Sequence, residues 1–278
     1  MSNYDARYYD HAWPSITGSL SAWEGRRVKA ITEMLPADCH SILDVGCGDG
    51  RVTNELLRQG RSVVGLDISR GGLKYVRTEA ICGSADVLPF TDNSFNLVLC
   101  TETLEHLPET IYHKALAELE RVARQFILAG VPFEEKLTNS MVACPRCDTR
   151  FHNSWHQRSF TESTLRSLFQ HFGTHHRQYE GAWTAYPEWL LAVLRYSGLL
   201  PQPQLPSFSA PMLCPQCGYH LPQAECKSAS EATGRTTAIP QWCKAAGKAL
   251  CGRTRYPWVL ALYQRWRDPT PTPSTEGE

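Results

Sequence analysis

Short apolar segments alternate with helical stretches between residues 41 and 131, and this alternation restricts the chain to few folds. Each apolar segment has the length of one strand, and the helical stretches can carry the chain back across a sheet. Such units form a parallel sheet with helices on both faces. We expect an α/β, doubly wound, mostly parallel sheet of seven strands. The expected strands are 41–45, 62–67, 80–83, 95–101, 125–131, 174–179 and 258–263. Helices are expected over 22–35, 52–59, 71–78, 109–123, 161–171 and 188–196.

A glycine-rich turn follows the first expected strand, where Leu43-Asp44-Val45 leads into Gly46-x-Gly48-x-Gly50. Glycines permit positive φ and let the bare backbone approach a ligand at the carboxyl edge of a sheet. Similar turns bind dinucleotides and phosphates, but those have G-x-G-x-x-G spacing. Asp44 would attract an ammonium group and repel a pyrophosphate. The turn therefore favours a ligand that carries a positive charge.

Acidic residues also follow the next two strands. Asp67 ends the second strand, where a carboxylate can accept hydrogen bonds from both hydroxyls of a ribose. Asp86 lies just beyond the third strand and could accept a hydrogen bond from an adenine amino group. Together with Asp44, these residues predict a nucleoside ligand with an amino group.

Three runs of sequence carry a resemblance to a known family: ILDVGCGDGRVT, VVGLDIS and CGSADVLPFTDNSFNLVLCTETLEHLP. Across residues 40–131 the chain resembles the class I S-adenosylmethionine-dependent methyltransferases of the type-11 group, which have a Rossmann-like sheet. The resemblance implies S-adenosylmethionine as cofactor. It places Asp44, Gly46 and Gly48 at the methionine end, Asp67 at the ribose with Ile68 beside it, Ala85 and Asp86 at the adenine, and Thr101 and Glu102 at the methyl-donor end.

Other residues are candidates for roles around this site. His106 follows the fourth strand and is a candidate base, although it could equally fix the loop or cap the next helix. Tyr9 belongs to an aromatic N-terminal group with Tyr4, Tyr8 and Trp13, which could cover the cofactor or simply pack on the first helix. Arg26 is a weaker candidate for pairing with the cofactor's carboxylate.

Two C-P-x-C pairs predict a metal site. Cys144 with Cys147, and Cys214 with Cys217, can supply four thiolates to a tetrahedral zinc ion. The 66 residues between the pairs indicate a module split into two insertions. A four-thiolate site has no open position, so the zinc would be structural. His152 and His156 are competing ligands, and free thiols or a labile disulfide are the alternative.

These motifs divide the chain into seven parts. They are a lid segment (1–35), a cofactor-binding core (36–133), the first zinc-knuckle insertion (134–160), a continuation of the core (161–200), a linker with the second knuckle (201–235), a C-terminal helix and last strand (236–267), and a disordered tail (268–278).

Charge composition gives weak guidance about partners. The chain has 28 basic and 28 acidic residues, which disfavours a field that attracts nucleic acid or acidic membranes. No apolar run has the length of a membrane span and the N-terminus lacks a signal peptide, so we expect a cytoplasmic protein. We expect O-methylation of a small molecule, such as a secondary metabolite or a sugar-containing precursor. The alternatives are an RNA methyltransferase with a zinc recognition module and a non-catalytic cofactor-binding scaffold.

Overall fold

The fold is taken from a computed structural model, which describes residues 20–181, 183–185, 212–220 and 253–266, with isolated positions at 6, 9, 10, 192, 193, 196 and 197. Seven strands form one sheet in the order β3-β2-β1-β4-β5-β11-β8. They are β1 (Ser41–Val45), β2 (Ser62–Asp67), β3 (Ala80–Cys82), β4 (Phe95–Thr101), β5 (Ala123–Pro132), β8 (Phe172–Glu180) and β11 (Trp258–Arg265). The predicted seven-stranded α/β sheet is therefore confirmed.

The sheet is parallel from β3 to β5, and β11 runs antiparallel between β5 and β8. The last strand thus returns to the same sheet, as expected. The strand order reverses beside β1, because the chain goes from β1 outward to β2 and β3 and then returns to β4. Open α/β sheets bind ligands at the carboxyl ends of strands at such a switch point.

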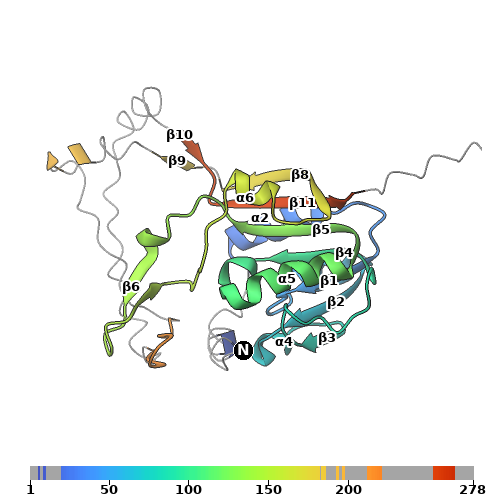
Figure 1. The fold of residues 1–278 in the computed structure, drawn as a ribbon, viewed down its shortest axis with the longest axis horizontal. Helices are drawn as coiled ribbons and strands as arrows, with labels where there is room; N and C mark the ends of the chain where they lie inside the picture. Colours follow the sequence, from blue (N-terminus) through green and yellow to red (C-terminus); the bar gives the residue numbers. More distant parts are fainter. Residues whose placement is uncertain are drawn as a thin grey trace, which may run out of the picture.

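Helices cover both faces of the sheet (Figure 1). On one face α5 (Glu109–Val122) and α6 (Glu162–Arg166) pack over Leu43 and Val98. On the other face α2 (Ala22–Met34) and α3 (Arg51–Arg58) pack over Ile42 and Leu97. Neighbouring strand residues therefore belong to opposite cores, as the two-residue period of a strand requires.

Two helices are shorter than the sequence pattern predicts. Residues 71–78 were expected to be helical, but α4 covers only Arg70–Leu73, since two glycines weaken it and Thr78 instead donates to the carbonyl of Val63. Residues 161–171 were expected to form one helix, but α6 ends at Arg166. The His171 amide then donates to Glu120 on α5, which holds the chain out of the helix.

Outside the main sheet, the residues that the structure describes form two small antiparallel pairs of strands. β6 (Met141–Ala143) pairs with β7 (Arg150–His152), and β9 (Trp183–Ala185) pairs with β10 (Arg253–Arg255). Short 3₁₀ helices lie at η1 (Leu104–His106) and η2 (Leu137–Ser140).

Several predictions fall outside the described residues. They concern Tyr4, Tyr8 and Trp13, most of the helix expected over 188–196, the linker and C-terminal helix, and the tail. Within the described part of the chain, no helix combines the length and apolar character needed to cross a membrane.

Candidate functional site

A cavity of about 500 Å³ opens at the carboxyl ends of β1, β2 and β4, at the switch point of the sheet. This volume is typical of a small-molecule site. Its floor is the glycine-rich turn between β1 and α3, one side is α2, and the opposite wall comes from residues 101–111 and 154–156.

The glycine-rich turn has the conformation that its sequence predicts. Gly46 has φ of +78°, and a Cβ there would lie 2.0 Å from the Thr103 hydroxyl. The Gly46 amide donates to the Leu66 carbonyl at 2.7 Å, and the Gly48 amide donates to Asp67 at 2.8 Å. The turn is therefore tied to the end of β2, which brings Asp67 to the same cavity.

Asp44 and Asp67 are buried carboxyls that line the cavity. Burial raises the pKa of Asp44 to about 7, the nearby Asp67 adds to this, and a 2.6 Å hydrogen bond from Thr53 opposes it. Burial also raises the pKa of Asp67, although the amides of Ser69 and Gly48 donate to it. A carboxylate has about four acceptor positions, so Asp67 keeps capacity for a ligand. A cation or a diol would satisfy these groups.

Most of the predicted cofactor residues line this cavity. Those that do are Asp44, Gly46, Gly48, Asp67, Ile68, Ala85, Thr101, Glu102 and Tyr9, together with the candidate base His106. Asp86 is not among the lining residues; its carboxylate accepts a hydrogen bond from Ser84, which does line the cavity.

The structure brings Arg27 to the cavity in place of Arg26. Arg27 shares a helix face with Glu24 and Ile31, at positions i−3 and i+4, and all three line the cavity. Arg26 instead stacks over the ring of Trp23 at 5.5 Å. The helical period of α2 was the signal that could have identified Arg27.

Two ion pairs fasten α2 to the cavity. The Arg27 guanidinium lies 2.9 Å from the carboxylate of Glu102. Arg51 bridges Glu24 at 2.5 Å and Asp49 at 2.8 Å, which joins α2 to the glycine-rich turn. Glu102 has φ of +53°, an uncommon conformation for this residue type, and such strain often occurs at functional sites. Sequence reasoning missed Glu24 and Arg51.

The inserted segment forms the far wall of the cavity. Ser154, Trp155 and His156 line the cavity, although the resemblance covers none of them. Arg158 fastens the segment to the core by donating to the carbonyls of Leu104 and Leu107 at 2.7 and 2.5 Å.

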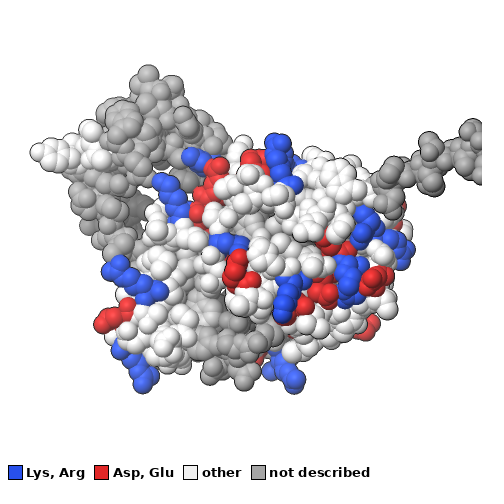
Figure 2. All heavy atoms as spheres, viewed as in Figure 1, with Lys and Arg blue, Asp and Glu red and all other residues white. Residues whose placement is uncertain are grey.

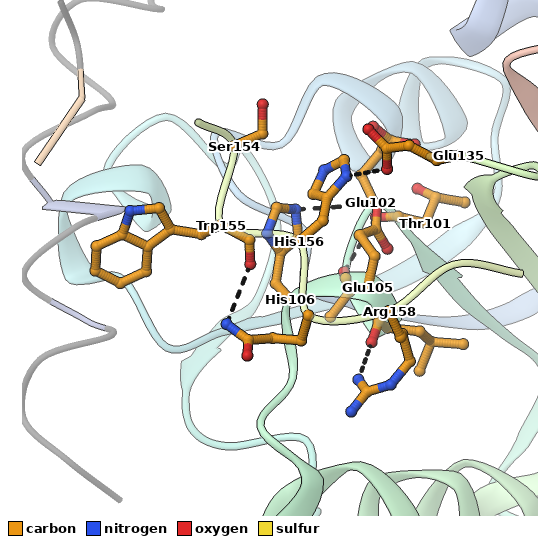
Figure 3. Close-up of polar contacts among 12 residues, drawn as sticks. Thr101, Glu102, Glu105, His106, Glu135, Ser154, Trp155, His156 and Arg158 are labelled. Atoms are coloured by element: carbon orange, nitrogen blue, oxygen red, sulfur yellow. Dashed lines mark hydrogen bonds and ion pairs between the residues drawn. The ribbon is translucent and has the colours of Figure 1, made fainter. Parts of the chain in front are cut away.

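Three histidines and a glutamate meet on this wall. His156 Nδ1 lies 2.5 Å from Glu135 Oε2, and His152 Nε2 lies 3.3 Å from Glu135 Oε1. The rings of His152 and His156 stack at 4.6 Å, and His106 meets His156 edge-on at 4.9 Å. Figure 3 shows His106, His156 and Glu135 converging from different parts of the chain.

These contacts shift the pKa values of Glu135 and His106 away from their ordinary values. Although partial burial opposes it, hydrogen bonds from His152 and His156 lower the pKa of Glu135 to about 2. Burial, helped by the neighbouring imidazoles, lowers the pKa of His106 to about 3. Glu135 is therefore ionised and His106 neutral at physiological pH.

The four cysteines of the C-P-x-C pairs come together as predicted. The sulfurs of Cys144 and Cys217 are 3.6 Å apart, as are those of Cys147 and Cys214. A tetrahedron of Zn–S bonds of 2.3 Å has edges of about 3.8 Å, so the thiols fit a zinc ion.

The two knuckles have the same backbone geometry. The amide of Asp148 donates to the Cys144 carbonyl at 2.9 Å, and Gly218 donates to Cys214 in the same way at 3.0 Å. Both Asp148 and Gly218 have positive φ. His152 and His156 group with Glu135 and not with the cysteines, so the geometry favours the four-cysteine set over the sets with histidine.

The knuckles share a small core with the cavity wall. Trp155 packs with Val142, Phe151 and Leu213, and Tyr9 lies against the same cluster. The Trp155 indole donates to the Leu213 carbonyl at 3.1 Å and holds Trp155 at φ of +60°. The cysteine module therefore supports two residues that line the cavity, Tyr9 and Trp155.

Comparison with known proteins agrees with this geometry. Residues 43–125 match the family model described as a methyltransferase domain. A ubiquinone biosynthesis O-methyltransferase of Albidiferax ferrireducens is 27% identical over 113 residues, 36% of this chain and 45% of that protein. An uncharacterised methyltransferase of Mycobacterium bovis is 33% identical over 121 residues, 40% of this chain and 48% of that protein. The matched region thus spans less than half the length of either relative.

The sheet also matches a solved structure. A candidate methyltransferase of Bacillus halodurans C-125 superposes with a TM-score of 0.50 at 15% identity, over 87% of this chain and 99% of that one. At this identity the likeness shows the fold alone. Residues 43–125 are thus similar to a methyltransferase domain, the sheet has the Rossmann-like fold, and a cysteine cluster is inserted after β5.

Proposed function

We propose that this protein transfers a methyl group from S-adenosylmethionine to an oxygen of a small molecule. The observation that carries the proposal is the pairing of two buried carboxyls, Asp44 and Asp67, on the floor of one cavity beside the glycine-rich turn. A buried carboxylate is costly unless a partner compensates it. The ammonium and ribose of S-adenosylmethionine supply such partners.

The remaining cofactor contacts follow from the shape of the cavity. Asp44 would bind the ammonium, and Asp67 the ribose hydroxyls. Ile68, Ser84 and Ala85 line the part that would hold the adenine, with Asp86 behind Ser84. Thr101 and Glu102 would lie near the donor methyl, on the same wall of the cavity as residues 154–156.

The walls around the cavity favour a small molecule as the methyl acceptor. Methyl transfer from a sulfonium is an in-line displacement, so the protein must mainly align the acceptor and exclude water. Trp155 and Tyr9 supply apolar surface for this purpose. The ubiquinone biosynthesis relative is named for O-methylation, which supports oxygen as the acceptor atom.

The face drawn in Figure 2 gives no support for a nucleic-acid acceptor. On the face drawn in Figure 2, basic and acidic side chains of the described residues are interspersed, without an extended basic area. Proteins that bind RNA backbones need such an area, because phosphate contacts supply most of the affinity.

We further propose a structural zinc ion held by Cys144, Cys147, Cys214 and Cys217. Zinc would fix the two knuckles together and so keep Tyr9 and Trp155 against the cavity.

The test is methyl transfer from radiolabelled S-adenosylmethionine to a library of phenols, sugar alcohols and amines. The proposal predicts labelled product from at least one hydroxyl compound. Labelling of amines alone would contradict the assignment of oxygen, and the absence of cofactor binding would contradict the assignment of the reaction.

A further inference from the structure

The inserted wall carries an ionisable arrangement that cofactor binding does not explain. Glu135, His152 and His156 all lie in residues 134–160, beyond the family match, yet His156 lines the cavity. Methyl transfer to a hydroxyl needs a group that removes the hydroxyl proton. This inference rests on the proposed methyl transfer to oxygen.

Hydrogen bonds determine which nitrogen of each ring carries a proton. The amides of Ser154 and His156 point at His152 Nδ1, at 3.2 and 3.3 Å, so this nitrogen is an acceptor without a proton. His152 Nε2 then carries the proton, and it faces Glu135 Oε1 at 3.3 Å. With one carboxylate oxygen facing His152, the other accepts from His156 Nδ1 at 2.5 Å.

This arrangement leaves one free lone pair on the ring of His156, a residue that lines the cavity. Because His156 Nδ1 donates to Glu135, His156 Nε2 has no proton in the neutral ring. We propose that His156 is the general base of the methyl transfer, and that Glu135 is the positioning residue that sets its tautomer and orientation (Figure 3).

The other ionisable groups nearby are less suited to accept the proton. His106 is a poor acceptor, because burial lowers its pKa to about 3. Glu102 is held in an ion pair with Arg27 at 2.9 Å. Glu105 is fully buried and does not line the cavity. The structure therefore favours His156 over His106, the residue that sequence position alone suggests.

The proposed step balances in atoms and charge. The acceptor oxygen forms a bond to the methyl carbon, and the carbon–sulfur bond of the sulfonium breaks with its electron pair remaining on sulfur. The hydroxyl proton goes to His156 Nε2. The resulting imidazolium is stabilised by the Glu135 carboxylate until the proton passes to water.

Nitrogen-15 NMR of the histidine rings, with S-adenosylhomocysteine bound, tests the arrangement without any acceptor. We expect the proton of neutral His156 on Nδ1, and Glu135→Gln should reduce this preference. A proton on Nε2 would overturn the proposal. So would a second metal ion that is lost in His156→Gln, because the cluster would then be a metal site.

Turnover tests the role itself, with the first hydroxyl acceptor that the library yields. His156→Gln should lower kcat by about 10²- to 10⁴-fold while the affinity for S-adenosylhomocysteine stays within about twofold. His113→Gln is the matched control, since His113 also pairs with a glutamate, Glu109 at 3.0 Å, but lies exposed on α5. Unchanged turnover in His156→Gln would refute only the role of His156 as general base. A wild-type protein that does not bind the cofactor would refute the proposed function.

Discussion

The floor and the far wall of the cavity are built in different ways. The floor consists of the glycine-rich turn and the ends of β1 and β2, and it is held by hydrogen bonds from backbone amides, such as that of Gly46 to the Leu66 carbonyl and that of Gly48 to the Asp67 carboxylate. The wall consists of an insertion that is held to the core by the Arg158 side chain and to a distant knuckle by Trp155. The floor thus depends on local backbone geometry, and the wall on long-range contacts and, as proposed, on zinc.

This difference predicts that a substitution in the floor or in the wall affects that region and leaves the other one intact. Changes on the floor should remove cofactor binding and leave the wall folded. Changes in the cysteine module should loosen the wall and leave the floor intact.

The largest effect is expected for Asp67→Ala. Loss of two charge-assisted hydrogen bonds, at about 1.5–3 kcal/mol each, should weaken S-adenosylhomocysteine binding by at least about 100-fold. Asp86→Ala is the comparison, and its effect should be much smaller because Asp86 does not line the cavity. Calorimetric titration of both variants measures the ratio, and equal effects would refute the assignment of the ribose to Asp67.

Much of the floor could be predicted from sequence, and the reason is physical. Asp44, Gly46 and Asp67 lie at the carboxyl ends of strands whose apolar pattern is evident, and in a parallel sheet the ends of those strands meet at one edge. The four cysteines could be predicted because a C-P-x-C turn presents two thiols at once.

The wall could not be predicted in the same way. His156 was expected only as an alternative zinc ligand, and its contact with Glu135 depends on how the insertion folds over η1. The role of His156 was therefore decided by long-range packing. Arg27 is a different case: the sequence interpretation named only Arg26, although the helical period places Arg27 on one face of α2 with Glu24 and Ile31, which also line the cavity.

A variant with both Cys144→Ser and Cys147→Ser should lose order in the wall while the floor remains folded. Zinc content should fall by one equivalent, since two of four thiolates are lost. Amide exchange should accelerate in residues 141–156 and 212–220 and stay unchanged in 41–67. Metal analysis and exchange mass spectrometry check this, with Cys82→Ser, an exposed thiol outside the cluster, as control. Faster exchange across the whole sheet would show that wall and floor form one unit.

Cofactor affinity should depend on pH through Asp44. Burial raises the pKa of Asp44 to about 7, above its ordinary value of 3.8, so the empty folded protein holds this proton more tightly than the unfolded chain does. The contribution of Asp44 to stability is then complete below about pH 4 and is lost as the pH rises through 7. Only the ionised carboxylate attracts an ammonium, so affinity should rise about tenfold between about pH 6 and about pH 8.

Two variants isolate this pH effect. Asp44→Asn should bind weakly with no such rise and should stabilise the empty protein at neutral pH. Asp38→Asn, on the exposed loop before β1, should retain the rise. An unchanged pH profile in Asp44→Asn would assign the effect to another group.

The smallest effect distinguishes two neighbouring residues of α2. Arg27→Gln removes a half-buried ion pair with Glu102, which should weaken S-adenosylhomocysteine binding by about fivefold, or about 1 kcal/mol. Arg26→Gln should change the affinity by less than about twofold, since Arg26 stacks on Trp23 away from the cavity. The opposite order would mean that the face of α2 toward the cavity has been assigned incorrectly.

Calorimetric titration of the wild-type protein with S-adenosylmethionine and S-adenosylhomocysteine, with metal analysis of the same sample, is the most direct test of whether this cavity binds the cofactor. We expect micromolar binding of both ligands at one site per chain, in protein that contains zinc. A folded, zinc-loaded sample that binds neither ligand would contradict the assignment of this cavity to S-adenosylmethionine.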